Sequence, residues 1–208
     1  MTPNRLIRAR LGVLALSLCL SACISLFPKE QPVQLYRLNL APPAVGASAA
    51  ASFAVRGAVG NFDRAAAGDH ILTVRGDKTA YIANARWVTS AQAMFEAALW
   101  EHFDADPGPA RLLNRGEISD ADDRLDVSVR HFETRYDPGS AAPPTVVVEI
   151  SAALDSAHDT ATRKHALFTA SVPAASNSVT AIVAAYGEAT SQVLAKLKTW
   201  VDAKGAGP

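Results

Sequence analysis

The chain has 208 residues, of which 20 are basic, 20 are acidic and 49% are hydrophobic. This composition is typical of an ordinary folded protein rather than a disordered or fibrous one. The formal charge of zero argues against the basic surface with which proteins bind nucleic acid. The only two cysteines, Cys19 and Cys23, exclude a disulfide-stapled scaffold and a cysteine-ligated zinc site, which need more cysteines at other spacings.

The first 22 residues differ in kind from the rest. They contain three arginines and no acidic residue, then an apolar run over residues 11–20, and then the small residues Ser21 and Ala22. This order is that of a bacterial export signal. A membrane-spanning helix needs roughly 20 apolar residues, so a retained transmembrane anchor is the weaker alternative.

The string Leu20-Ser21-Ala22-Cys23 resembles the lipobox of bacterial lipoproteins. The resemblance implies that the Cys23 thiol receives a diacylglycerol, that the chain is cut before Cys23, and that the new amino group is acylated. Three acyl chains would make membrane attachment effectively permanent. The alternative is a cysteine that happens to follow an ordinary cleavage site. Cys19 does not fit the pattern, because the bulky Leu18 directly precedes it.

The residue after Cys23 indicates which of the two membranes would hold the lipoprotein. In the sorting system that this sequence resembles, Asp at that position retains a lipoprotein in the inner membrane, whereas this chain has Ile24. We therefore expect a lipid-anchored protein of the outer membrane of a Gram-negative bacterium, facing the periplasm. The mature chain would hold 17 basic and 20 acidic residues, because the signal removes three arginines and no acid. Its one remaining cysteine would be lipidated and could form no internal disulfide.

The mature chain is predicted to have two parts. Residues 23–51 would form a lipidated tether with a short strand at Val33–Leu40 and an uncharged linker of Ala, Pro, Gly and Ser over 41–51. Residues 52–204 would form the folded domain, which is long enough to bury about two-thirds of its unfolded surface.

Period-2 alternation from Phe53 to Val59 predicts a half-buried strand, and a loop follows to residue 69. The runs 71–74 and 79–82 predict a hairpin around Gly76-Asp77. Arg75-Gly76-Asp77 also spells an adhesion tripeptide, but turn chemistry accounts for Gly-Asp without a receptor. A capping box of Thr89 and Gln92 predicts the start of an amphipathic helix.

The second half is predicted to be a strand meander followed by a helix. Residues 125–136 change parity near Arg130-His131, which indicates a bulge, and further strands follow at 146–154 and 166–172. Ser176 or Ser178 would cap a final helix whose apolar stripe runs to Val201. The order indicates an α+β domain, with a mainly antiparallel sheet and two principal helices packed on one face.

No residues stand out as a catalytic, metal or cofactor site. Known hydrolase, phosphate-loop and dinucleotide motifs are missing from the sequence. His131 and Glu133 could touch a metal from one side of a strand, but two residues make no site. The acidic run Asp120, Asp122, Asp123 and Asp126 lacks the glycine and distal glutamate of a calcium loop, so we read it as solvated. We therefore expect that the protein is not an enzyme.

The whole mature chain resembles the ABC-type transport auxiliary lipoproteins, the lipoprotein components of mammalian-cell-entry-type lipid transport systems. The similar features, in chain order, are the lipobox at Cys23, Tyr36-Arg37-Leu38, Asn61-Phe62-Asp63-Arg64, the strand into Ile71-Leu72-Thr73-Val74-Arg75, Arg86-Trp87-Val88 before the Met94-Phe95 helix, the Leu125–Phe132 strand and the C-terminal helix. The chain departs from its relatives at Trp87-Val88-Thr89-Ser90, where they tend to carry Trp-Ala-Glu followed by Leu, and in its Ala-rich linker.

The resemblance implies a non-catalytic docking element at the outer membrane. Its partners would be a periplasmic mammalian-cell-entry-type transport protein and the ABC transporter that supplies energy, and a homo-oligomeric ring is a further expectation. Two alternatives stay open: a lipoprotein that itself binds an apolar ligand between sheet and helices, and a structural lipoprotein of the envelope.

Overall fold

The structure, a computed structural model, describes residues 32–40, 51–105, 108–114, 116–137, 142–156 and 163–205. The chain divides into two units, residues 1–32 and residues 33–208, and the fold below is that of the second. The predicted signal peptide, Cys23 and residues 41–50 of the linker lie outside the described residues.

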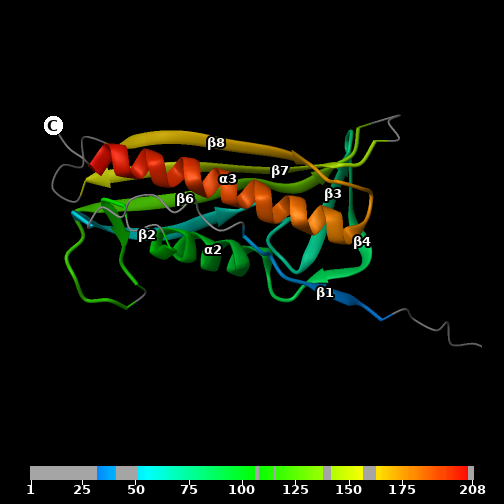
Figure 1. The fold of residues 1–208 in the computed structure, drawn as a ribbon, viewed down its shortest axis with the longest axis horizontal. Coiled ribbons are helices and arrows are strands. Elements are labelled where there is room, and N and C mark those ends of the chain that lie inside the picture. Colours follow the sequence, from blue (N-terminus) through cyan, green and yellow to red (C-terminus); the bar gives the residue numbers. More distant parts are fainter. Residues whose placement is uncertain are drawn as a thin grey trace, which may run out of the picture. The chain divides into compact units, whose positions relative to one another are not determined.

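Eight strands and two helices make up the described part of this unit (Figure 1). In chain order they are β1 (Gln34–Tyr36), β2 (Phe53–Phe62), β3 (His70–Arg75), β4 (Lys78–Trp87), α2 (Ala91–Ala105), β5 (Ala110–Leu112), β6 (Asp123–Arg135), β7 (Thr145–Ser156), β8 (Lys164–Pro173) and α3 (Val179–Gly205). The short strand predicted within the tether, at Val33–Leu40, is β1; it is shorter than predicted and belongs to the same sheet as the others.

β6 is the centre of the sheet. β7 pairs with it in antiparallel fashion along its whole length, and β8 pairs with β7. On its other side β6 carries two groups of strands, one after the other. β2 pairs with the first half of β6, and β5 lies beyond β2. β3 pairs with β6 at Thr134 and Arg135 near its end, and β4 and then β1 lie beyond β3.

The prediction of a mainly antiparallel sheet was wrong, because the sheet is mixed. The pairs β1–β4, β2–β5, β2–β6 and β3–β6 are parallel. Antiparallel neighbours can be joined by a tight turn, whereas parallel neighbours need a longer connection. The chain makes such a connection between β2 and β6, through the β3–β4 hairpin, α2 and β5. Alternation along a strand reveals its buried face but not the direction of its partners.

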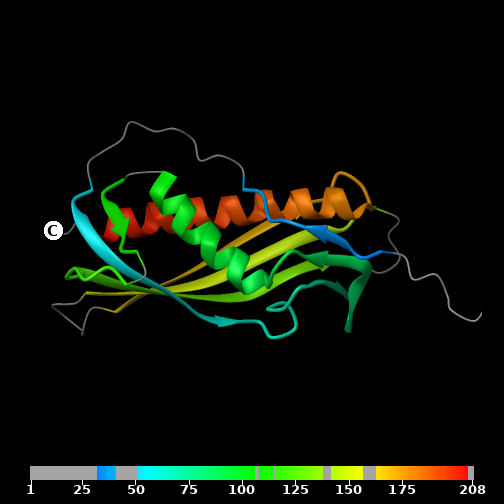
Figure 2. The ribbon, with the colours of Figure 1, turned by 90° about the horizontal axis from the view of Figure 1, so that it is seen from below.

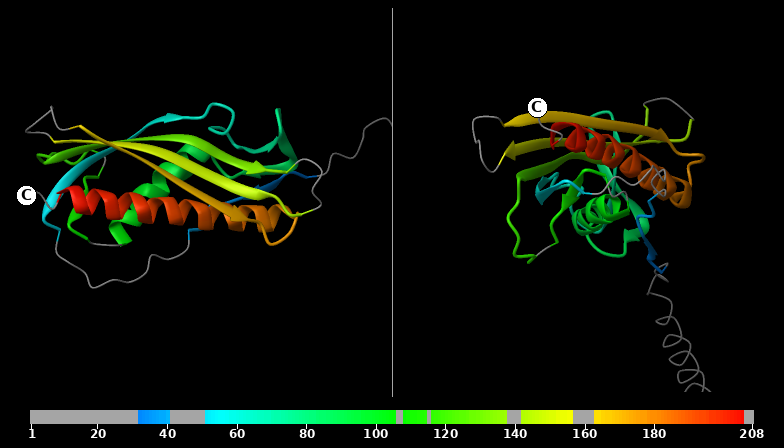
Figure 3. Two further views of the ribbon diagram at one scale, coloured as in Figure 1. Left: turned by 90° about the horizontal axis from the view of Figure 1, so that it is seen from above. Right: turned by 60° about the vertical axis from the view of Figure 1, so that its left-hand side comes forward.

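Both helices cover the same face of the sheet, as predicted (Figures 2 and 3). β6 shows how the sequence achieves this. Leu125, Val127 and Val129 are buried, the register then shifts between Val129 and His131, and Phe132 and Thr134 are buried on the far side of the shift. The predicted bulge is therefore confirmed. It keeps the apolar side chains of both halves of the strand directed at the helices.

Serine hydroxyls begin both helices. Ser90 Oγ accepts a hydrogen bond from the Ala93 amide at 3.2 Å, and Ser178 Oγ accepts one from the Ala181 amide at 3.2 Å. The predicted cap at Thr89 was one residue too early, because the capping oxygen comes from the residue directly before the first helical one.

The hairpin prediction is confirmed, since β3 and β4 pair up to Arg75 and Lys78 around Gly76, whose φ is 61°.

An aromatic cluster fixes α3 to the β3–β4 end of the sheet. The Tyr186 ring lies 5.2 Å from Trp87 and 4.7 Å from Phe132, centroid to centroid. Its hydroxyl accepts a hydrogen bond from Thr134 Oγ1 at 3.2 Å and donates one to the Leu72 carbonyl at 3.4 Å. Burial raises the pKa of Tyr186 well above its ordinary value of 10.0.

The segment that follows β1 crosses α3 in close contact. A β-carbon on Gly187 would collide with the backbone carbonyl of Asn39, so only glycine allows this approach. The Val88 amide donates to the Tyr36 carbonyl at 2.8 Å, and Tyr36, Leu38 and Leu40 pack against the core. Residues 36–40 are thus joined to the folded unit by backbone hydrogen bonding and by packing.

Candidate functional site

Four of the residues weighed in the sequence as metal ligands have protein partners, namely Asp122, Asp126, His131 and Glu133. His131 lies 3.6 Å from Glu133, whose carboxylate also accepts a hydrogen bond from Arg135 at 2.6 Å. Asp122 accepts a hydrogen bond from the Ala54 amide at 2.7 Å, and Asp126 pairs with two arginines. Among the residues that the structure describes, no group of three or more His, Cys, Asp or Glu side chains could hold a metal ion.

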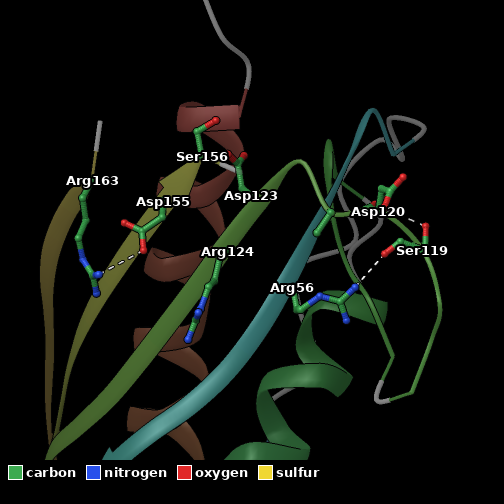
Figure 4. Close-up of a pocket in the computed structure, with 9 residues that line it drawn as sticks. Arg56, Ser119, Asp120, Asp123, Arg124, Asp155, Ser156 and Arg163 are labelled. Carbon is green, nitrogen blue, oxygen red and sulfur yellow. Dashed lines mark hydrogen bonds and ion pairs between the residues drawn. The ribbon is translucent and has the colours of Figure 1, made fainter. Parts of the chain in front are cut away.

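A polar pocket of about 560 Å³ lies at the end of the sheet where β6 begins (Figure 4). Its lining comes from β2, β6, β7, the residue before β8 and the loop after β5, namely Arg56, Ser119, Asp120, Ala121, Asp123, Arg124, Asp155, Ser156 and Arg163. Among the described residues, this lining holds three arginines and three aspartates.

Strand register brings these charges together. Arg56 of β2 is opposite Arg124 of β6, and Arg124 is opposite Asp155 of β7. Residues in register on neighbouring strands point to the same face. Leu154 is opposite Lys164, which brings Arg163, the residue before β8, beside Asp155. The result is a charged row across four neighbouring segments.

The arginines are held by neighbouring oxygens but remain accessible. Arg56 Nη2 donates to the Ser119 carbonyl at 2.8 Å. Arg163 lies 3.3 Å from Asp155 and 3.7 Å from Asp126, and Arg124 lies 3.4 Å from Asp126. The Arg124 side chain is 66% exposed and that of Arg163 is 49% exposed. Exposed pairs of this kind contribute little to stability, so their guanidinium groups can exchange partners.

An ion pair fixes the loop that forms one wall of the pocket. Arg111 Nη1 and Nη2 donate to the two carboxylate oxygens of Glu117 at 3.1 and 2.9 Å, and Glu117 also accepts from the Asn114 amide. The hydrogen bond from Arg111 lowers the pKa of Glu117 below its ordinary value. The ion pair and the hydrogen bonds of Glu117 therefore hold the loop that places Ser119 and Asp120 in the wall of the pocket.

This pocket was missed in the sequence. Arg56 stood at an outward position of a predicted strand, but three strands and a loop contribute to the site, and only their mutual register reveals it. Arg124 and Arg163 carry no local pattern that separates them from ordinary surface residues. The one available signal was the cluster of Asp residues around 120–126, of which Asp120 and Asp123 do line the pocket.

A second pocket, of about 420 Å³, lies against α2. It is lined by Ala93, Glu96, Ala97, Trp100 and Asn114. The Trp100 Nε1–H donates to the Leu113 carbonyl at 3.3 Å, which fixes the orientation of its ring. This surface offers apolar contact but little charge.

Within the described residues, neither helix is long and apolar enough to cross a membrane.

The comparison with curated proteins gives no match. Two solved structures share the fold. A crystal structure of a protein from Xanthomonas campestris matches with a TM-score of 0.72 and 23% identity, over 83% of this chain and 97% of that one. The crystal structure of an uncharacterized protein matches with a TM-score of 0.64 and 14% identity, over 82% and 99%.

The family comparison covers the sheet from β2 onward and the larger part of the last helix. Residues 38–197 match the model of the ABC-type transport auxiliary lipoprotein component. The matched range contains β2 to β8, α2, the polar pocket and the aromatic cluster around Tyr186. The chain therefore belongs to the family of ABC-type transport auxiliary lipoproteins.

Proposed function

We propose that this protein is a non-catalytic lipoprotein, anchored in the outer membrane through Cys23, that docks the periplasmic protein of a mammalian-cell-entry-type lipid transport system. Membership of the auxiliary lipoprotein family supports an accessory role in ABC-type transport. The ABC transporter would supply the energy. The lipid anchor and the docking surface are the parts that this chain itself would provide.

The observation that carries the proposal is the separation of the first strand from the polar pocket. β1 belongs to the strand group attached where β6 ends, whereas the pocket lies where β6 begins. A 13-residue strand spans about 40 Å. Because β1 follows Cys23 closely in the chain, an anchor at Cys23 would leave the pocket end free to meet a partner in the periplasm.

The pocket suits a protein partner with charged and polar groups. Three guanidinium groups supply donors and three carboxylates supply acceptors, and such mixed charges guide association and set specificity more than they add affinity. Confinement to a membrane surface raises the effective concentration of the two proteins, so modest contacts suffice.

Lipidation is tested by mass spectrometry of the protein purified from membranes with detergent. We expect the N-terminal peptide to begin at Cys23 and to carry a diacylglycerol and an N-acyl chain. In the Cys23→Ser variant we expect no acylated N-terminal peptide, because serine lacks the thiol that would receive the diacylglycerol. An unmodified thiol at Cys23, or release of the wild-type protein by salt alone, would contradict the anchor.

Docking is tested by co-purification of the lipidated chain with the mammalian-cell-entry-type protein of the same bacterium. Arg124→Glu with Arg163→Glu should reduce recovery about tenfold or more, because both reversals place like charges where acidic groups already stand. Lys78→Glu is the matched control, a reversal at an exposed position in the β3–β4 hairpin at the other end of the sheet. Equal recovery of the transport protein with the wild type, the double arginine variant and Lys78→Glu would refute the pocket as the docking surface.

The α2 pocket favours one alternative, in which the protein itself binds an apolar ligand. Trp100 makes this alternative measurable, since a ligand against its ring would change the fluorescence of that residue. A lipid that co-purifies with the protein and is lost in Ala97→Asp would support ligand binding. Retention of the same lipid in that variant would count against it.

A further inference from the structure

Three large apolar side chains are exposed at the β1 edge of the sheet. Val33 is 47% exposed, Leu35 is 56% exposed and Val88 is 44% exposed, and they make up half of the six large hydrophobic residues that are exposed in the described part. β1 is an edge strand, with β4 as its neighbour. Single exposed apolar residues are ordinary, but a group at one edge indicates an interaction surface.

Register places these side chains on one face. Tyr36 lies beside Trp87, which is buried in the core, and Leu35 lies beside Arg86. Because successive side chains of a strand point to opposite faces, Leu35 and Arg86 point away from the core. Val33 and Val88 are each two residues from this pair, at the same parity.

Arginines accompany the apolar group. Arg37 is exposed and follows Leu35 at the same parity. Arg86 is 40% exposed and lies 3.0 Å from Asp69, so its charge is largely balanced by that carboxylate. Apolar side chains with a guanidinium group at their margin suit the boundary between acyl chains and phosphate headgroups, where an arginine stem can lie in the apolar layer and its head in water.

Chain length points to lipid as the occupant. Val33 is ten positions after Cys23, and a fully extended chain covers at most about 3.6 Å per residue. If Cys23 is acylated, this edge stays within about 36 Å of the membrane surface by the same rule, which is less than the length of β6. Of all the surfaces of the folded unit, this edge is the one nearest to the acyl chains along the sequence.

We propose that the edge formed by Val33, Leu35 and Val88, with Arg37 at its margin, rests on the phospholipid surface and orients the domain on the membrane. The inference rests on the proposed lipidation of Cys23, but it adds a second, non-covalent contact to that anchor. With the β1 edge on lipid, the β6 strand would carry the polar pocket away from the bilayer.

The test uses the lipidated full-length protein in vesicles of phosphatidylethanolamine and phosphatidylglycerol. With Cys23 acylated the mature chain has no free thiol, so a fluorescent maleimide can be placed at Leu35→Cys or Val88→Cys. Ile118→Cys and Leu167→Cys are matched controls, because both residues are exposed hydrophobics on other strands or loops. Lipids with nitroxide on the upper acyl chain serve as quenchers.

We expect quenching of the probes at positions 35 and 88 to exceed that at positions 118 and 167 by about threefold or more, since only the former would reach the acyl-chain boundary. Equal quenching at all four positions would overturn the proposal while leaving the anchor intact, provided that the protein floats with the vesicles. Failure to float would overturn lipidation and this inference together. Protection of position 35 from aqueous iodide that rises with protein concentration, without lipid quenching, would assign the edge to a second copy instead.

Discussion

The two ends of α3 differ in the polar contacts that accompany their apolar packing. At the β1 end, α3 is fixed by aromatic packing of Tyr186 against Trp87 and Phe132. At the pocket end, Leu197 and Val201 of α3 are likewise buried in the core, and an ion pair within the helix lies beside them: Lys198 is 2% exposed and its Nζ lies 2.7 Å from Asp202. Asp202 also accepts a hydrogen bond from the Ala110 amide of β5 at 3.0 Å.

This difference relates to what each end would meet. The β1 end, with its aromatic packing and hydrogen bonds, would rigidly hold the segment that leads to the membrane. The pocket end adds charged groups to its apolar packing, and its polar surface would face water and partners. Removing one partner of an ion pair is costly when the other charge stays buried, so we expect the pocket end to depend on Asp202 more than on Lys198.

Asp202→Ala is expected to have the largest effect on stability. It would leave the Lys198 ammonium buried beside the Phe103 ring without a carboxylate, at a cost of about 3–5 kcal/mol in free energy of unfolding. Lys198→Met should cost much less, because Asp202 is 21% exposed and keeps its bond to Ala110. Urea unfolding measures both variants, and equal losses would show that the pair does not act as a buried charge.

Tyr186→Phe is expected to cost about 1–3 kcal/mol at neutral pH, since the Leu72 carbonyl and the Thr134 hydroxyl lose their partner. The same variant tests the pKa of Tyr186, which burial raises. The folded state then keeps the proton while the unfolded state loses it above pH 10, so stability should fall as the pH rises past about 10. The fall should be shallower in Tyr186→Phe, and identical slopes in the two proteins would refute the shift.

Gly187→Ala is expected to have a smaller, local effect at the β1 end. Alanine would ordinarily stabilise a helix interior by about 1 kcal/mol relative to glycine, but here its β-carbon meets the Asn39 carbonyl. We expect a small net loss and faster amide exchange in residues 36–40 and 88. Gly108→Ala at the pocket end is the comparison, since its β-carbon would instead meet the side-chain ends of Lys198 and Asp202 rather than a backbone carbonyl. Unchanged exchange in Gly187→Ala would show that this approach is not tight in solution.

Much of the fold could be predicted from periodicity, but its pairing could not. The β3–β4 hairpin, the bulge between Val129 and His131 and the final helix all follow from local patterns, because turn residues and apolar spacing report local conformation and burial. The parallel pairing of β2 with β6 depends on a connection of many residues that no local pattern encodes. For the same reason the row from Arg56 to Arg124 and Asp155 could not be read from the sequence, although Arg56 stood at an outward position of a predicted strand.

The central claim is that the pocket end, and not the β1 end, meets the transport protein. Photo-crosslinking in the living bacterium tests it directly, with a photoreactive residue at Ile118, which is fully exposed in the loop beside Arg56, Ser119 and Asp120, or at Val88. We expect Ile118 to crosslink to the periplasmic mammalian-cell-entry-type protein and Val88 to give no such product. Crosslinks to that protein from Val88, with none from Ile118, would contradict the account.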